Sequence, residues 1–169
     1  MSGHSRWSQI RHKKAASDQK RGQVFSKLSR IITLAARKGA DPKANPSLAS
    51  AIEQARAMNM PNENIERAVK KVSEKGAAQL EEIVVEALGP GGVAMRIKGV
   101  TDNKNRTISE IKSILSSHEA KMVSLGSVSW MFHQPIEKVP EGAEAKLDKL
   151  LEALDNHDDV EDVALNVSV

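Results

Sequence analysis

The residues best able to do chemistry are the cations near the start of this chain of 169 residues. The first 38 residues hold ten Lys or Arg side chains against one acid, Asp18, which gives a balance of +9. Each cation that meets a phosphate releases a condensed counterion, so this segment predicts nucleic-acid binding that weakens steeply as salt rises. A solvated helix face is the alternative, but the lack of compensating acids favours nucleic acid. The candidate contact residues are Arg6, Trp7, Arg11, His12, Lys13, Lys14, Lys20, Arg21, Lys27 and Arg30.

Two residue types in this segment allow other interpretations. Trp7 offers a surface on which a base would stack, an interaction worth about 1–3 kcal/mol. Alternatively, Trp7 and Ile10 pack against the helices that follow and anchor the N-terminal segment, and this interpretation is slightly favoured. His4 and His12 have too few neighbouring acids to predict a metal site, so they are expected to belong to the basic surface.

A second polar cluster lies at residues 101–107, in the sequence TDNKNRT. Backbone N–H groups at the start of a following helix, with Arg106 beside them, would suit an anion. The same residue types also end strands and cap helices, so a well-capped turn is an equal alternative. The residues of the possible anion site are Asn103, Asn105, Arg106 and Thr107.

Enzymatic chemistry has little support in the sequence. There is no cysteine, which excludes disulfides, thiolate catalysis and Cys-ligated metal sites. No Gly-x-Ser-x-Gly, His-Glu-x-x-His, phosphate-loop or dinucleotide motif occurs. The acids of the second half, such as Asp155 and Asp159, are attributed to solubility, and a magnesium-dependent nuclease is the weak remaining enzyme hypothesis. We therefore expect no catalysis, no cofactor, no metal and no small-molecule substrate.

Charge divides the chain into two halves. Residues 1–79 carry 16 Lys/Arg and 6 Asp/Glu, a balance of +10, whereas residues 80–169 carry 9 and 16, a balance of −7. Such asymmetry predicts a polyanionic partner for the first half alone. No apolar run approaches the roughly 18 residues that span a membrane, and the start does not resemble a secretory signal. We expect a cytoplasmic monomer without membrane contact.

The elements that must position the basic residues are helical. Between residues 17 and 38, apolar side chains recur every three or four positions, which predicts a helix whose regular part Gly22 is expected to delay. Asn45-Pro46 predicts the start of a second helix that Pro61 ends, and a third helix follows. Three amphipathic helices can enclose one small core, so residues 1–78 are predicted to form an α-helical nucleic-acid-binding domain.

The second half changes period. Alternating apolar residues on both sides of the turn Gly89–Gly92 predict a β-hairpin. The capping box Thr107-x-x-Glu110 predicts a helix, residues 128–132 a third strand, residues 147–154 a second helix and residues 163–169 a last strand. The order β-β-α-β-α-β predicts a four-stranded sheet with two helices on one face, as an acidic α+β domain over 79–169. The predicted class is thus α + (α+β), and residues 134–145 are its one long loop.

Long ordered strings run through the chain: Gly3-His4-Ser5-Arg6-Trp7, Ile10-Arg11-His12-Lys13-Lys14, Lys20-Arg21-Gly22, Phe25-Ser26-Lys27-Leu28, Asn45-Pro46, Met58-Asn59-Met60-Pro61, Asn64-Ile65-Glu66-Arg67-Ala68, Gly89-Pro90-Gly91-Gly92-Val93, Thr101-Asp102-Asn103, Asn105-Arg106-Thr107 and Gly126-Ser127-Val128. They resemble the YebC/PmpR family, which is related to the mitochondrial translational activators of cytochrome c oxidase. The resemblance covers nearly the whole chain. It implies a helical N-terminal domain followed by α+β domains, no cofactor, and the basic and Trp positions above as the nucleic-acid surface.

The resemblance also implies two possible functions. Bacterial members are generally labelled DNA-binding transcriptional regulators, and others act on translation at the ribosome. Typical members carry a third domain between the strand near Phe132 and the helix near Leu147, whereas here the loop 134–145 takes its place, so this chain resembles a short form. The family label favours transcription. Binding to ribosomal RNA or the ribosome needs only shape and phosphate contacts from a basic arm, so the residues themselves modestly favour translation.

Overall fold

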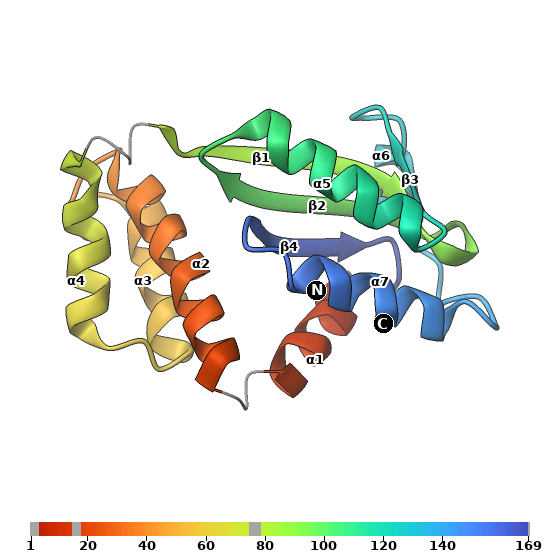
Figure 1. Cartoon of the computed structure of the whole chain (residues 1–169), viewed down its shortest axis with the longest axis horizontal. Helices are drawn as coiled ribbons and strands as arrows, with labels where there is room; N and C mark the ends of the chain where they lie inside the picture. Colours follow the sequence, from red (N-terminus) through yellow and green to blue (C-terminus); the bar gives the residue numbers. More distant parts are fainter. Residues whose placement is uncertain (1–3, 15–17, 75–78, 169) are drawn as a thin grey trace.

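The structure is a computed structural model that describes residues 4–14, 18–74 and 79–168, without the side chains of residues 12–14 and 18. Figure 1 shows α2, α3 and α4 side by side at one end of the molecule, and the sheet with α5 and α7 at the other. The elements of the first half are α1 (Ser5–Lys14), α2 (Asp18–Ala36), α3 (Pro46–Ala57), α4 (Asn62–Lys70) and the short 3-10 helix η2 (Lys71–Ser73).

The second half confirms the predicted α+β architecture. Its strands form one antiparallel sheet in the order β3-β1-β2-β4, and β1 pairs with β2 in the expected hairpin, with Val85 opposite Ile97. Helices α5 and α7 lie side by side over the sheet (Figure 1). The elements are β1 (Glu81–Leu88), the turn helix η4 (Pro90–Gly92), β2 (Ala94–Thr101), α5 (Lys104–Ser117), β3 (Lys121–Val123), α6 (Ser129–His133), α7 (Glu144–Asp155) and β4 (Val160–Leu165).

The helical domain, by which we mean α2 to α4, closes around an aliphatic core. Asn45 fixes the turn between α2 and α3, because its side-chain oxygen accepts the Leu48 N–H at 3.2 Å while its amide donates to the carbonyls of Ala35 and Gly39 at 2.8 Å. This is the N-cap that the Asn-Pro pair predicts. The core consists of Leu28, Ile32, Ala36, Leu48, Ala51, Ile52, Ala55, Met60, Ile65 and Ala68.

Three predicted boundaries are wrong. The third strand is β3, whereas residues 129–133 form the short helix α6: Val128 is buried but Trp130 is 60% exposed, so the alternating residues do not share one face. The last strand is β4, which begins at Val160 rather than three residues later. Helix α2 begins at Asp18 and passes through Gly22 without a break.

Helix α1 packs on the α+β domain rather than on the helices that follow it. Trp7 is 1% exposed and Ile10 is 7% exposed, and both belong to the core that the sheet shares with α7. At the edge of this contact, Arg6 Nε donates to Asp148 Oδ1 at 2.6 Å and His4 Nδ1 lies 2.9 Å from Asp162 Oδ1. The anchoring interpretation of Trp7 is therefore the one the structure supports, but with a different partner from the one we expected.

The segment between α6 and α7 is short and paired. Ile136 forms an isolated parallel bridge with Val167, accepting the Ser168 N–H at 2.8 Å and donating to the Asn166 carbonyl at 2.9 Å. Val139 and Ala143 are buried in the core of the α+β domain.

No helix in the described part of the chain combines the length and apolar character needed to cross a bilayer.

Candidate nucleic-acid interface

One face of α2 meets an acidic segment of the α+β domain. Lys20, Gln23, Lys27 and Arg30 recur at spacings of three and four, so they share a helix face. All four hydrogen-bond to residues 155–159, where α7 ends and β4 begins. We call this contact the interdomain seam. The acids that we attributed to solubility therefore pair with the cations that we assigned to phosphate.

Lys27 is enclosed at the centre of the seam. Its side chain is 5% exposed, and its Nζ donates to the Asp155 carbonyl at 2.6 Å and lies 3.8 Å from Asp155 Oδ1. Burial lowers the pKa of Lys27 to about 8, even though the charge of Asp155 opposes this shift. A cation held in this way is not accessible to a nucleic-acid phosphate.

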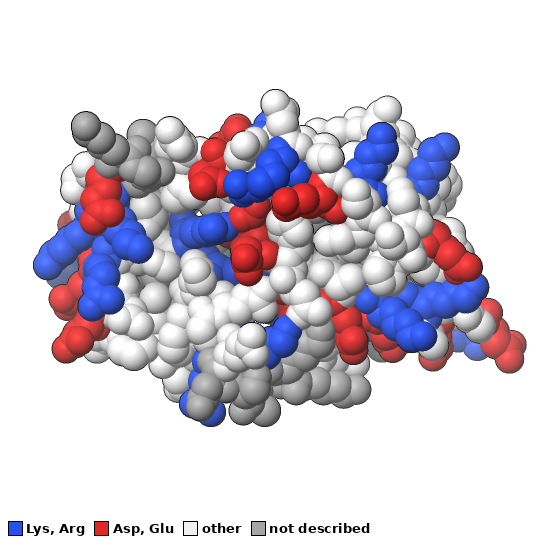
Figure 2. Space-filling view, in the orientation of Figure 1, with Lys and Arg blue, Asp and Glu red and all other residues white. Residues whose placement is uncertain are grey.

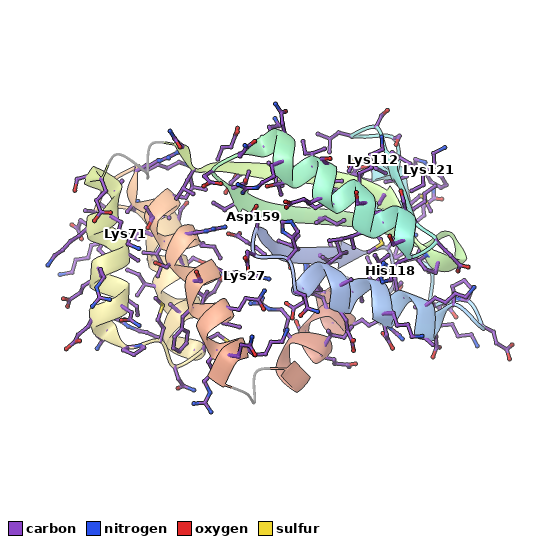
Figure 3. All side chains as sticks on the ribbon, viewed as in Figure 1. Lys27, Lys71, Lys112, His118, Lys121 and Asp159 are labelled. Carbon is purple, nitrogen blue, oxygen red and sulfur yellow. The ribbon has the colours of Figure 1, made fainter. Side chains whose placement is uncertain are left out.

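Asp159 forms the other end of the seam, and Figure 3 shows it across the seam from α2. Its buried carboxylate accepts hydrogen bonds from Arg30, from Arg106 Nη2 at 3.1 Å and from Thr107 Oγ1 at 2.7 Å. Burial acts to raise the pKa of Asp159, but the bonds from Thr107, Arg30 and Arg106 outweigh it and hold that pKa below its ordinary value. The three donors are thus arranged around an anion that the protein itself supplies.

The second polar cluster is accordingly a capped turn with an internal anion. The Asn103 side chain accepts the Arg106 N–H at 3.2 Å as the N-cap of α5. Arg106 also donates to Asp102 at 2.8 Å, and its side-chain bonds to Asp102 and Asp159 raise the pKa of its guanidinium. Asn105 is exposed at the same helix end. Of the two interpretations of this cluster, the geometry favours the capped turn.

Glu110, His157 and Asp159 lie close enough together to suggest a metal site. Their hydrogen bonds explain the cluster without a metal. His157 Nε2 lies 2.6 Å from Glu110 Oε2, and its Nδ1 accepts the Asp159 N–H at 3.1 Å. Arg30 and Arg106 both bond to the Asp159 carboxylate, so a further cation there would be repelled.

Glu161 is a half-buried acid beside the seam. Burial, with the charges of Glu82 and Asp162, raises the pKa of Glu161 to about 8, against the opposing charges of Lys27 and Arg11. Its Oε1 is buried and has no hydrogen-bond partner among the described residues. A carboxyl without a partner is expected to keep its proton at neutral pH.

This arrangement predicts a pH-dependent gain in stability for Glu161→Gln. The folded-state pKa of about 8 lies above the ordinary value of 4.5, so wild-type stability falls as pH rises between these values. Glutamine cannot ionise, so the variant should gain roughly 1–3 kcal/mol at pH 8.5, and little at pH 4.5. Urea unfolding at both pH values measures the difference. Equal gains at the two pH values, or a similar gain for the exposed control Glu137→Gln, would contradict the assignment.

The ten predicted contact residues lie in different environments in the structure. Trp7 is buried in the core, so its role as a stacking surface is wrong. Lys27 and Arg30 belong to the seam, Lys20 bonds to Asn156 and Arg6 pairs with Asp148. Arg21 is exposed and Arg11 half-buried. The side chains of His12, Lys13 and Lys14 lie outside the described residues.

Sequence reasoning missed a groove beside the seam, which Arg30 also lines. It has a volume of about 520 Å³ and runs between α2 and α4. Figure 2 shows cations over α4 on this face with acids beside them, and Figure 3 places Lys71 across α2 from Lys27 and Asp159. The spacing of Asn64, Arg67 and Lys71 by three and four was the signal that could have found it. Polar side chains that line this α2–α4 groove are Ser26, Ser29, Arg30, Thr33, Asn64, Arg67, Lys71, Glu74 and Asp102.

The chain is similar in sequence to known proteins over most of its length. Residues 5–75 match the family model described as the TACO1/YebC protein N-terminal domain, and residues 80–136 match the model of the TACO1/YebC second and third domain. A "probable transcriptional regulatory protein" of Prosthecochloris aestuarii is 49% identical over 159 residues, which is 90% of this chain and 64% of the relative. Another of that name, from Halothermothrix orenii, is 46% identical over 160 residues, 92% of this chain and 63% of the relative.

A solved structure has the same fold. A conserved hypothetical protein from Aquifex aeolicus matches with a TM-score of 0.81 and 33% identity, covering 96% of each chain. By contrast, this chain spans slightly less than two thirds of the length of the first two curated relatives.

Proposed function

The chain belongs to the TACO1/YebC family, and from this premise we propose that it is a non-enzymatic nucleic-acid-binding protein that regulates transcription through DNA. Many curated relatives carry the name "probable transcriptional regulatory protein", which supports this choice. We propose that it acts as a cytoplasmic monomer.

The observation that carries the proposal is the distribution of charge that the fold leaves outside the seam. The acids of residues 155–159 face the inner side of α2 and offset Lys27 and Arg30. Arg21, Arg67 and Lys71 are exposed on the helical domain, in the half of the chain with a balance of +10. We propose that these three residues, with Lys13 and Lys14 at the end of α1, contact phosphates. Lys27 and Arg30 instead hold the two domains together.

The second candidate function is translation, through ribosomal RNA or the ribosome. The exposed cations described above are sufficient for phosphate contacts on either nucleic acid, because such contacts position a protein without reading sequence. The longest helix of the helical domain, α2, has one face turned into the seam, which limits its use as a recognition helix in the major groove.

A competition experiment distinguishes the two functions. Labelled protein is titrated with random duplex DNA, promoter-containing duplex DNA, ribosomal RNA and ribosomes at several salt concentrations. The proposal predicts that one particular duplex competes best and keeps its advantage as salt rises. Ribosomes that win at near-physiological salt, while DNA binding disappears, would establish the translational function instead. If nothing binds, the basic segment is a solvated face and both functions are wrong.

A further inference from the structure

We propose that the α2–α4 groove binds one unpaired strand of nucleic acid, with phosphates on Arg67 and Lys71 and a base against Phe25. This inference rests on the proposed function and adds to the duplex contacts of the basic segment a place where the protein holds an unpaired strand. The groove adjoins the seam at Arg30, and three of its other lining residues, Phe25, Arg67 and Lys71, provide the necessary chemistry.

The phosphate contacts are assigned to two cations that have no side-chain partner among the residues the structure describes. Asn64 and Arg67 of α4 line the groove with Lys71 at the start of η2, while Ile65 and Ala68 are buried in the core. Arg67 and Lys71 are exposed, and neither makes an ion pair or a side-chain hydrogen bond with another described residue. This contrasts with Lys27 and Arg30 of the seam, whose charges are already paired.

The acids that line the groove do not cancel these charges. Asp102 is paired with Arg106 at 2.8 Å, and Arg30, which also lines the groove, is paired with Asp159. These two pairs leave Arg67 and Lys71 against a single acid, Glu74. The groove therefore favours an anion, and the Asn64 amide beside the cations offers a further donor.

Gly22 provides an independent indication that a ligand approaches α2 closely. Among the glycines that the structure describes, Gly22 is the one with neither a positive φ nor a crowded Cβ position. A Cβ there would meet nothing within 4 Å, and the residue lies inside a helix, where glycine is a poor choice. The fold gives no reason for this glycine. Gly22 lines the groove, so close contact between a ligand and the helix backbone would explain why a glycine stands there.

Phe25 determines which form of nucleic acid fits. It is half-buried, lines the groove and follows Gly22 by one helical turn. A volume of about 520 Å³ lies within the roughly 300–1,000 Å³ typical of small-ligand sites, so a nucleotide-sized unit fits. A duplex keeps its bases stacked inside and cannot offer one to a ring, whereas an unpaired strand can.

The test uses the full chain and three labelled probes: a twelve-nucleotide thymidine strand, an abasic strand of the same length and a twelve-base-pair duplex. Arg67→Gln with Lys71→Gln should weaken binding of the thymidine strand by roughly 10- to 100-fold and make the log–log salt slope shallower by about 1.4, from two lost phosphates. Phe25→Leu should remove most of the preference for thymidine over the abasic strand. The matched control is Lys112→Gln with Lys121→Gln, which are exposed cations of the α+β domain.

Gly22→Gln separates binding from folding. Glutamine is a better helix former, so the melting temperature should rise by roughly 2–4 °C while affinity for the thymidine strand falls at least about tenfold. The exposed position Ser50 on α3 serves as control, since Ser50→Gln should leave binding unchanged. If all groove variants bind as wild type does, the groove is not the site, although the proposed function stands. If they weaken duplex binding equally, the assignment to one strand is wrong. If wild-type protein binds none of the probes, the proposed function fails as well.

Discussion

Replacing Trp7 with alanine is expected to lower the free energy of unfolding by roughly 3–5 kcal/mol, because the side chain fills the core of the α+β domain. A tryptophan buries about 150–250 Å², and only 1% of Trp7 remains exposed. α1 contacts α7 and β4, so the loss of its main anchor should release this helix from the domain.

The second tryptophan provides a matched control. Trp130 lies in α6 and is 60% exposed, so Trp130→Ala should change the free energy of unfolding by less than about 1 kcal/mol. Guanidinium unfolding followed by circular dichroism compares the two variants. If both unfold at the wild-type midpoint, α1 is not docked as the structure describes.

Local sequence rules were sufficient for most of the fold. The three-residue and four-residue spacing defined α2 to α4, and Asn45 capped α3 as predicted, because such signals act within a few residues. The hairpin around Gly89–Gly92 was predictable for the same reason. Residues 129–133 were not, since three alternating apolar residues fit a strand or a short helix equally well until tertiary contacts decide between them.

The partners of α1 and of the basic face of α2 could not be predicted. An apolar face shows that a helix packs, but not on which domain it packs, and Trp7 sits on a core made by residues more than seventy positions away. Likewise, the chain shows ten cations and a separate group of acids, and only the fold brings Arg30 against Asp159. About half of the predicted contact residues are therefore buried or bonded to other residues of the protein. Arg67 and Lys71 were overlooked because they lie outside the most basic segment.

The seam explains why only some cations of the most basic segment are left to contact nucleic acid. Buried charges such as Lys27 are costly to leave unpaired, so the acidic segment 155–159 and the face of α2 hold each other in place. The outward cations are then presented by a fixed scaffold. This division assigns the paired residues to structure and the exposed ones to phosphate.

Reversing the charge of Lys13, Lys14, Lys20 and Arg21 together should therefore reduce nucleic-acid affinity by more than about 100-fold at roughly 0.1 M salt. Each lost phosphate contact removes about 0.9 from the log–log salt slope on duplex DNA, so the loss of the contacts of Lys13, Lys14 and Arg21 should make it shallower by about 3. Arg21 is exposed on the N-terminal turns of α2, and Lys20 lies at the rim of the seam, where it bonds to the exposed Asn156. The fold should therefore survive, with an unchanged circular dichroism spectrum.

The control carries the same change in net charge on the other domain. Lys112, Lys121, Lys138 and Lys149 are exposed, so their reversal to glutamate alters the total charge equally without touching the proposed interface. Similar losses in both quadruple variants would mean that binding reflects net charge alone.

The most direct measurement of the central claim is the duplex-DNA affinity of wild type and these two quadruple variants at several salt concentrations, by fluorescence anisotropy. We predict a steep wild-type slope, a similar slope for the control and a shallow one, with affinity near the detection limit, for the variant of Lys13, Lys14, Lys20 and Arg21. Wild-type affinity and slope in that last variant, with its fold intact, would show that these residues do not bind nucleic acid.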